Sequence, residues 1–194
     1  MTEENTFRRY VFPAIYADEE CIEQVKNIRI KSIYGIPSSD YNFDAYVNRA
    51  CFLYVDVKRR LFSSTPHDNF KRFVELVYER APDLVFDLEK KTLLCNCITL
   101  KHGHDEALFI GRGSPIEIIE IKGSKTFPLV DVGSYVHRKD KICYVVTRKQ
   151  EVRVIKSPVD GIVFYIGEVF SEIGQALYII IVGEDNVIKL TRTP

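Results

Sequence analysis

Four residues in one short segment, CNCITLKHGH, have side chains that bind metal ions: Cys95, Cys97, His102 and His104. Thiolate and imidazole are the ligands that zinc prefers in tetrahedral sites. If the segment begins as a strand, Cys95 and Cys97 share one face, and the following turn would bring the two histidines back to it. The spacing differs from the common zinc motifs, so two core cysteines followed by two loop histidines is the alternative.

Other signatures of catalysis are weak. A nucleophilic Cys/His site needs a histidine that activates the thiol, and neighbourhood in the sequence does not establish one. The glycines of IGRGS, residues 110–114, precede no helical pattern, which argues against a phosphate-binding loop. The sequence therefore favours a protein that is not an enzyme and that binds no cofactor.

The composition of the 194 residues suits one large domain or two small ones. Lys plus Arg and Asp plus Glu both number 27, so no net field favours nucleic acid or a membrane. The N-terminal MTEENTFRRY lacks the apolar region of a secretion signal, and the longest apolar run, LYIIIVG, is far shorter than the ~20 residues of a membrane span. We expect a cytoplasmic protein whose five cysteines are free thiols, and the scarcity of Met and Trp leans toward a thermophilic source.

The first part of the chain, residues 1–112, predicts a mixed α+β domain. Alternating apolar residues indicate strands at 8–16 and 49–57. The segment 66–80 predicts the main helix, because Thr65 suits an N-cap, Pro66 the first helical position, and apolar residues then recur at helical spacing. Those apolar residues are Phe70, Phe73, Val74 and Val77.

The remainder, residues 113–194, carries no helical pattern. Short alternating runs such as IEIIEIKG, KICYVVT and GIVFYIG are separated by Gly, Asp, Asn and Pro. This texture predicts a small all-β module. The fold class expected for the whole chain is therefore α+β, with a mixed domain followed by an all-β domain.

Three motifs of the second part resemble those of the biotinyl/lipoyl domain. They are Val136-x-x-Lys139-Asp140-x-Ile142, Lys156-Ser157-Pro158-Val159-Asp160-Gly161, and Gly174-Gln175-x-Leu177. The resemblance covers roughly residues 115–190 and implies a barrel-sandwich hybrid fold. In that family the first motif has glycine where this chain has Lys139. The whole chain also resembles an archaeal family of uncharacterised proteins with a biotinyl/lipoyl-like C-terminal half, a resemblance that implies no activity.

The resemblance implies a hairpin tip at which carrier domains hold biotin or lipoate on a lysine, eleven positions before the glycine of the Pro-x-x-Gly motif. Counting back from Gly161 reaches Gln150, which has no amine, whereas the lysine is Lys149, one residue earlier. Biotin carriers flank this lysine with Met and lipoate carriers precede it with an acid, whereas the segment here reads TRKQE. Adjacent residues of a hairpin point in different directions, so the shift disfavours attachment.

Three functions of different classes follow. The first is a non-catalytic binding or scaffold protein, with a carrier-like module that docks a protein partner or a second copy of the chain. The second is a biotin or lipoate carrier modified at Lys149. The third is a zinc-binding protein or metalloenzyme that uses Cys95, Cys97, His102 and His104.

Overall fold

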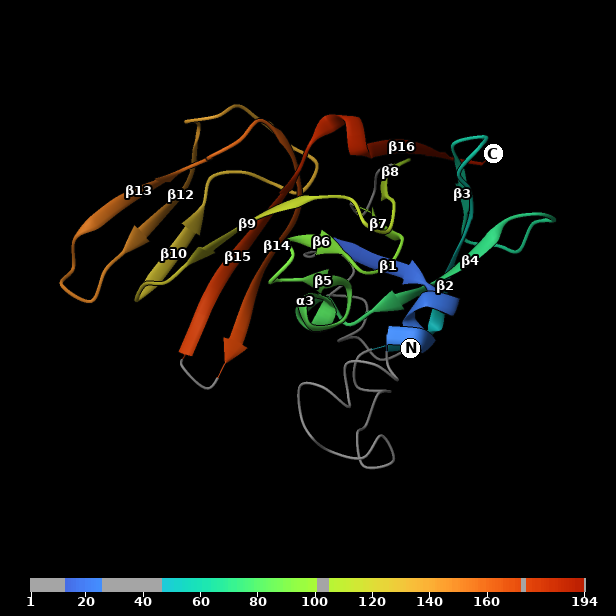
Figure 1. Cartoon of the computed structure of the whole chain (residues 1–194), viewed down its shortest axis with the longest axis horizontal. Coiled ribbons are helices and arrows are strands. Elements are labelled where there is room, and N and C mark those ends of the chain that lie inside the picture. The colour runs from blue at the N-terminus through green and yellow to red at the C-terminus, as the bar shows by residue number, and fades with distance from the viewer. Residues whose placement is uncertain (1–12, 26–46, 101–104, 172–173, 194) are drawn as a thin grey trace. The chain divides into compact units, whose positions relative to one another are not determined.

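A computed structural model of the chain describes residues 13–25, 47–100, 105–171 and 174–193 (Figure 1). Contacts within the chain divide it into two compact units. Unit 1 comprises Met1–Ser114 together with Ile188–Pro194, and unit 2 comprises Pro115–Val187. Unit 2 is therefore an insertion in the sequence of unit 1.

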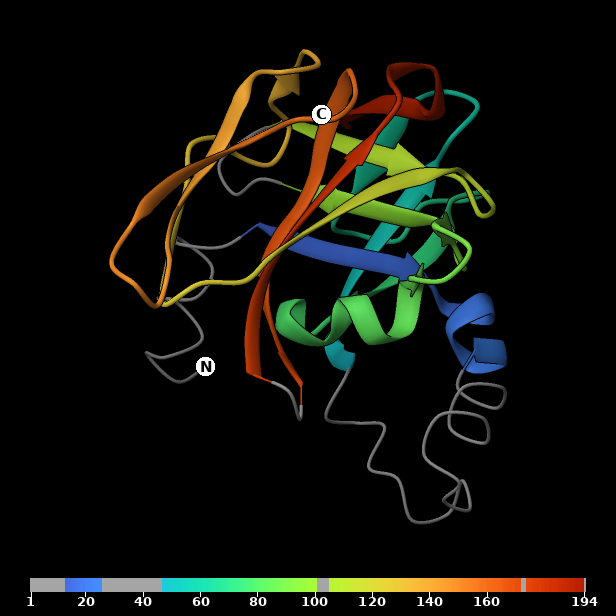
Figure 2. The same ribbon diagram turned by 60° about the vertical axis from the view of Figure 1, so that its left-hand side comes forward.

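Unit 1 is built around a closed barrel with the strand order β1-β4-β2-β3-β16-β8-β7. Antiparallel pairing of β1 with both β4 and β7 closes the barrel, and Figure 2 shows β1 in blue beside the green β7. The strands are β1 (Ala14–Asp18), β2 (Val47–Asp56), β3 (Leu61–Ser63), β4 (Lys71–Leu76), β7 (Cys97–Leu100), β8 (Glu106–Ile110) and β16 (Val187–Arg192).

Large apolar side chains fill the barrel. Phe73 of β4 and Phe109 of β8 meet edge to face with their ring centroids 6.3 Å apart, a favourable arrangement for aromatic pairs. Around them lie the other members of the core, among them Leu53, Val55, Phe62, Ile98, Leu100 and Leu190. Because successive strand residues point to opposite faces, the alternation in the sequence determines which side chains enter this core.

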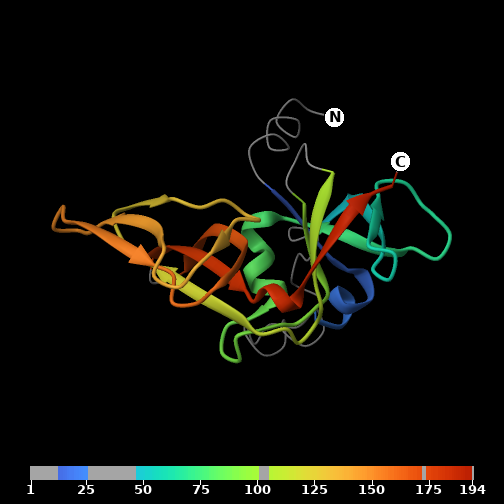
Figure 3. The same ribbon diagram turned by 90° about the horizontal axis from the view of Figure 1, so that it is seen from above.

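The last strand, β16, belongs to this barrel. It pairs in parallel with β3, with Thr191 beside Leu61, and Figure 3 shows it in red next to β8. The sequence predicts a single module over residues 113–194, whereas the strand after Val187 lies in the other unit. The alternation of VIKLTR indicates a strand but contains no information about which sheet receives it.

The helix expected over 66–80 is wrong. A turn closes with the Phe70 N–H donating to the His67 carbonyl, and Asn69 has a φ of 66°, which no right-handed helix permits. Strand β4 follows, and its Phe73 pairs with Asp18 of β1. Thr, Pro, Asp and Asn favour both helix starts and tight turns, and the burial of β4 in the barrel decides the outcome.

The α+β fold class expected for the chain is also wrong, because the described part of unit 1 is a barrel with short helical segments. Residues 19–25 are helical, and Tyr78–Arg80 (η2, a 3-10 turn) leads into α3 (Ala81–Val85). A small hairpin of β5 (Phe86–Asp87) and β6 (Thr92–Leu93) completes the unit. Among the described helices, none has the length and apolar character to cross a bilayer.

Unit 2 contains a three-stranded sheet with the order β10-β12-β13 and a four-stranded sheet with the order β11-β14-β15-β9. Its core includes Val136, Ile142, Cys143, Val145, Val163, Leu177, Ile179 and Ile181. The strands are β9 (Ile116–Ile121), β10 (Lys125–Pro128), β11 (Tyr135–Val136), β12 (Lys141–Val146), β13 (Val152–Lys156), β14 (Gly161–Ser171) and β15 (Gly174–Val182), followed by the 3-10 turn η3 (Glu184–Asn186).

Gly161 begins β14 at a point where the backbone of β15 comes very close. A Cβ at this position would lie 2.5 Å from the Val182 carbonyl oxygen and 2.8 Å from a methyl of Ile181. Its φ of 158° adds to the requirement for glycine. The glycine of the Pro-x-x-Gly motif is therefore needed for the packing of two paired strands.

We expect Gly161→Ala to destabilise the protein by about 2–3 kcal/mol, because backbone atoms on β15 would have to move. Gly183→Ala is the matched control, since its Cβ would meet only an ordinary contact at 3.5 Å with the Asn186 amide nitrogen. The control should be neutral or slightly stabilising. Urea unfolding measures both, and equal midpoints for the two variants would contradict the close approach.

Candidate functional site

The hairpin between β12 and β13 ends in a three-residue loop. The Thr147 N–H donates to the Glu151 carbonyl at 2.9 Å, and the Gln150 N–H donates to the Thr147 carbonyl at 3.0 Å. Gln150 adopts the left-handed conformation with a φ of 63°. This is a turn followed by a bulge residue, the common solution for a three-residue hairpin loop.

The loop places Arg148 and Lys149 in the middle of the turn and Gln150 after it, all of them exposed. Val146 and Val152 form the last ladder pair before the turn. Gln150 is the bulge residue, so this loop is one residue longer than a two-residue hairpin turn. Lys149 therefore lies at the apex of this loop.

Two further turns brace the other end of this hairpin. Lys139 has a φ of 77°, and its N–H donates to the Ser157 carbonyl at 2.8 Å. The buried Ser157 hydroxyl donates to the Val159 carbonyl at 2.6 Å. The Asp160 carboxylate accepts the Arg138 N–H at 3.0 Å; this hydrogen bond lowers the pKa of Asp160. These contacts join the segments 137–140 and 157–160 into one braced unit.

One surface of the β10-β12-β13 sheet is apolar and exposed. Cross-strand pairing places Phe127 beside Tyr144 and Tyr144 beside Val154, and it places Val146 beside Val152. Directly opposite residues share a face, so these five side chains form a single patch, which we call the apolar face. Phe127 is 51% exposed, Val152 66% and Val154 40%. The opposite surface of the sheet contributes Cys143, Val145 and Ile155 to the core.

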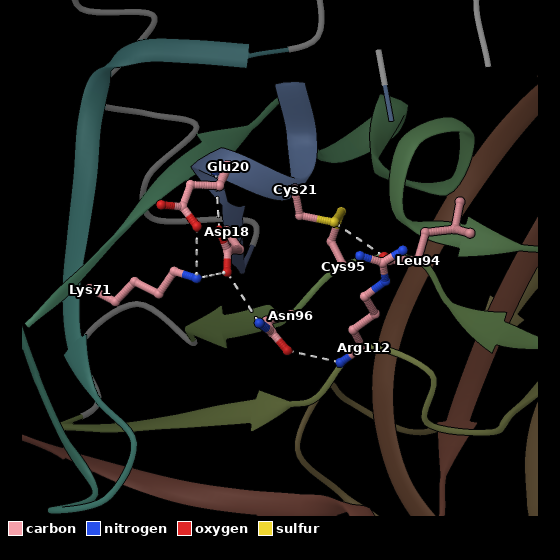
Figure 4. Close-up of polar contacts among 8 residues, drawn as sticks. All are labelled: Asp18, Glu20, Cys21, Lys71, Leu94, Cys95, Asn96 and Arg112. Carbon is pink, nitrogen blue, oxygen red and sulfur yellow. Dashed lines mark hydrogen bonds and ion pairs between the residues drawn. A yellow bond between two sulfur atoms is a disulfide. The ribbon is translucent and has the colours of Figure 1, made fainter. Parts of the chain in front are cut away.

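A buried carboxylate organises the end of β1 in unit 1. Asp18 is 2% exposed, and in Figure 4 its side chain lies between Lys71, with which it forms an ion pair, and Asn96. One Asp18 oxygen accepts the Glu20 N–H at 3.1 Å and the other accepts the Asn96 amide at 3.1 Å. The first interaction is an N-cap of the helix at 19–25. Asn96 in turn accepts the Arg112 N–H at 2.9 Å.

The charges of this cluster suit a structural role and not a nucleophilic role for Lys71. The hydrogen bond to Asp18 raises the pKa of Lys71, and the charges of Asp18 and Glu20 add to the effect while desolvation opposes it. A lysine that is held in its protonated form cannot attack an electrophile. The Asp18 cluster is therefore best understood as the polar link between β1, β4 and β7.

Cys95 forms a disulfide with Cys21, so the expectation that all five cysteines are free is wrong. The two Cα atoms lie 5.7 Å apart across a separation of 74 residues. The disulfide joins the helix at 19–25 to the segment before β7 (Figure 4). The sequence could not identify this pairing, because Cys21 and Cys95 carry no spacing motif.

The expected zinc ligands are not brought together among the described residues. Cys95 is occupied by the disulfide, and Cys97 is buried with its sulfur donating to the Cys95 carbonyl at 3.5 Å. His102 and His104 lie outside the described residues. Within the described ranges, no group of three or more His, Cys, Asp and Glu side chains is arranged around a common point.

Cys97 is also poorly suited to be a nucleophile. Burial raises the pKa of its thiol well above the ordinary value, and the nearby Asp18 charge acts in the same direction. The reactive form of cysteine is the thiolate, which this environment suppresses. Sequence reasoning missed both Asp18 and the apolar face. The alternation of valines at 152 and 154 was the available signal for the latter.

The cysteine pairing predicts the number of reactive thiols. In denaturant without reductant, Cys51, Cys97 and Cys143 should react with a thiol reagent, giving three groups per chain, and reductant should raise this to five. Reduction of the Cys21–Cys95 disulfide should lower the free energy of unfolding by about 4 kcal/mol, since it closes a long loop. A Cys21→Ala/Cys95→Ala variant is the control, because reductant should not change its stability. Five thiols before reduction would contradict the disulfide.

Comparison with known proteins agrees with the archaeal resemblance of the sequence. The model of the family described as "Uncharacterized protein conserved in archaea (DUF2118)" matches residues 12–184. The chain is also similar to Uncharacterized protein MJ0859 of Methanocaldococcus jannaschii, with 31% identity over 67 residues, or 34% of this chain. That match spans 41% of the length of the relative. The family match runs from β1 of unit 1 through β15 of unit 2, which is most of the chain, and the chain belongs to this archaeal family.

Proposed function

We propose that this chain is a non-catalytic docking protein that binds a polypeptide through the apolar face of unit 2. The observation that carries the proposal is the exposure of Phe127, Val152 and Val154 on one continuous sheet surface. Scattered apolar residues are normal on protein surfaces, whereas a contiguous patch marks an interaction site. The partner is another protein or a second copy of the chain.

The rest of unit 2 supports a rigid docking role. Two left-handed residues, Lys139 and Gln150, define the turns at the two ends of β12. Such conformations persist where the surrounding structure holds them, and here backbone hydrogen bonds do so. Rigid presentation of an apolar patch lowers the entropic cost of association. The resemblance to carrier modules is compatible with this role, because the function of a fold depends on the site built on it and not on the fold itself.

Photocrosslinking tests the docking function in an archaeal host. A photoreactive phenylalanine analogue replaces Phe127, and its control replaces Leu88, which is 43% exposed in unit 1. We expect irradiation to give a discrete covalent adduct with a polypeptide from position 127 and none from position 88. Adding Val152→Asp to the first protein should abolish the adduct, because a charge in the patch must be desolvated.

The outcomes separate docking from nonspecific contact. An adduct from both positions, or one that survives Val152→Asp in a folded protein, would count against the apolar face. The absence of any adduct at position 127 would remove the proposed function altogether. The mass of the adduct identifies whether the bound polypeptide is a second copy of this chain.

A second function, a biotin or lipoate carrier modified at Lys149, is favoured by one observation. Lys149 lies at the apex of the β12–β13 hairpin, with the bulge residue Gln150 after it. The side chain is exposed, so an attachment enzyme would reach it. The missing flanking residues, Met or an acid, count against recognition by the usual enzymes.

Intact mass of the protein from an archaeal host tests the carrier function. A carrier should show an added mass that Lys149→Ala abolishes and Gln150→Ala preserves, because only the lysine supplies an amine. An unmodified mass in protein from cells supplied with biotin and lipoate would eliminate this function. It would leave the docking function unaffected, because that function depends on the sheet surface.

A further inference from the structure

The β13 strand is an open edge of its sheet. The three-stranded sheet has the order β10-β12-β13, so among the strands that the structure describes β13 has a neighbour on one side only. Thr147 and Glu151 form a hydrogen-bonded pair at the turn, and antiparallel ladders alternate such pairs with non-bonded ones. The backbone groups of Arg153 and Ile155 therefore point to β12, whereas those of Val152 and Val154 point away from the sheet.

The two edges of this sheet differ. The β10 edge contains Pro128, which has no N–H to offer to another strand. Proline is one of the common devices that prevent strand addition at an edge. The β13 edge, with the sequence VRVIK, contains neither a proline nor a bulge in its own chain. Of the two edges, β13 is the one whose backbone can receive a further strand.

Positive charge surrounds the apolar face at this edge. Lys156 follows Val152 and Val154 on the same side of β13, and Lys141 lies directly opposite it. Like charges that oppose one another across a ladder are unfavourable unless an anion lies between them. Lys125 lies at the other end of the face, opposite Val146. None of these three lysines has an ion pair with another of the described residues.

The acids near the face differ in their partners, and one of them is paired with a cation. Glu151 accepts a hydrogen bond from Arg153 at 2.9 Å. Asp140 accepts the His137 N–H at 2.8 Å, and Asp160 accepts the Arg138 N–H. These backbone contacts leave the charges of Asp140 and Asp160 in place, but the strand register does not put either acid on the face. The charged residues that the register puts on the face are Lys125, Lys141 and Lys156, so the complementary partner is acidic.

We propose that the occupant is an extended acidic segment of a partner protein, which adds to β13 as a new strand. Its apolar side chains lie beside Val152 and Val154, and an acidic side chain lies beside Lys156 and Lys141. This inference rests on the docking function proposed above and names its partner class. A second copy of the chain would bring another basic face to the same edge, and the like charges would repel.

A synthetic peptide tests this inference with the full chain. The probe alternates valine with threonine and has an aspartate at each end, so that either strand direction can form. Its control carries lysine in place of each aspartate. We expect saturable binding of the acidic peptide by fluorescence anisotropy, weakened by salt, and at least about tenfold weaker binding of the control.

Reversal of the charges separates specific pairing from general adhesion. The Lys141→Glu/Lys156→Glu variant should lose the acidic peptide and gain the lysine peptide. Two N-methylated peptides, one methylated at its valines and one at its threonines, extend the test. Only one of them should lose binding, because only every second peptide N–H faces β13. No saturable binding up to about 1 mM, or binding indifferent to both changes, would overturn strand addition.

Failure of this inference differs from failure of the docking function. One decisive result is a crosslinked adduct at Phe127 that is removed by Val152→Asp and yet is unchanged by Lys141→Glu/Lys156→Glu. That result would retain the docking function and overturn the acidic strand. The absence of any adduct at Phe127 would remove both.

Discussion

The buried carboxylate of Asp18 is the constraint on which unit 1 depends. A charge at 2% exposure is stable only when its oxygens are fully paired, and Lys71, Asn96 and the Glu20 N–H supply the partners. These partners come from β4, the segment before β7 and the helix at 19–25, which are separated widely in the sequence. The carboxylate thus specifies how the two neighbours of β1 meet it, at the seam where the barrel closes. The disulfide between Cys21 and Cys95 fastens the same region covalently.

Unit 2 distributes its apolar residues differently. Its core takes the inward residues of both sheets, whereas several outward residues of β10, β12 and β13 are apolar as well. A sheet that only had to fold would carry polar side chains on its solvent face. The left-handed turns at Lys139 and Gln150 add local strain at the ends of the same strands. Exposed apolar area on one sheet surface is a feature that folding alone does not require, and the proposed docking function rests on it.

The sequence predicted unit 2 better than unit 1. Alternation and turn residues indicated the strands after residue 113, and the motif glycine Gly161 was identified together with its turn. The helix at 66–80 failed because a Pro-Asp-Asn turn and a helix start share the same residue types, and barrel pairing decided between them. The Asp18 cluster and the disulfide depend on contacts between residues distant in the chain, which no local pattern encodes. The position of Lys149 at the apex of its turn depends on the loop length, which the left-handed Gln150 determines and which no local pattern indicated.

The position of β16 has a consequence for the order of folding. This strand follows unit 2 in the sequence and lies between β3 and β8 in the barrel. During synthesis, all other strands of the barrel leave the ribosome before it, and the whole of unit 2 is made in between. Unit 2 has its own core and a contiguous sequence, so it can fold while the barrel still has an unfilled gap. Until β16 has left the ribosome, β3 and β8 each have an unpaired edge, and this interval is when the nascent protein most needs protection from aggregation.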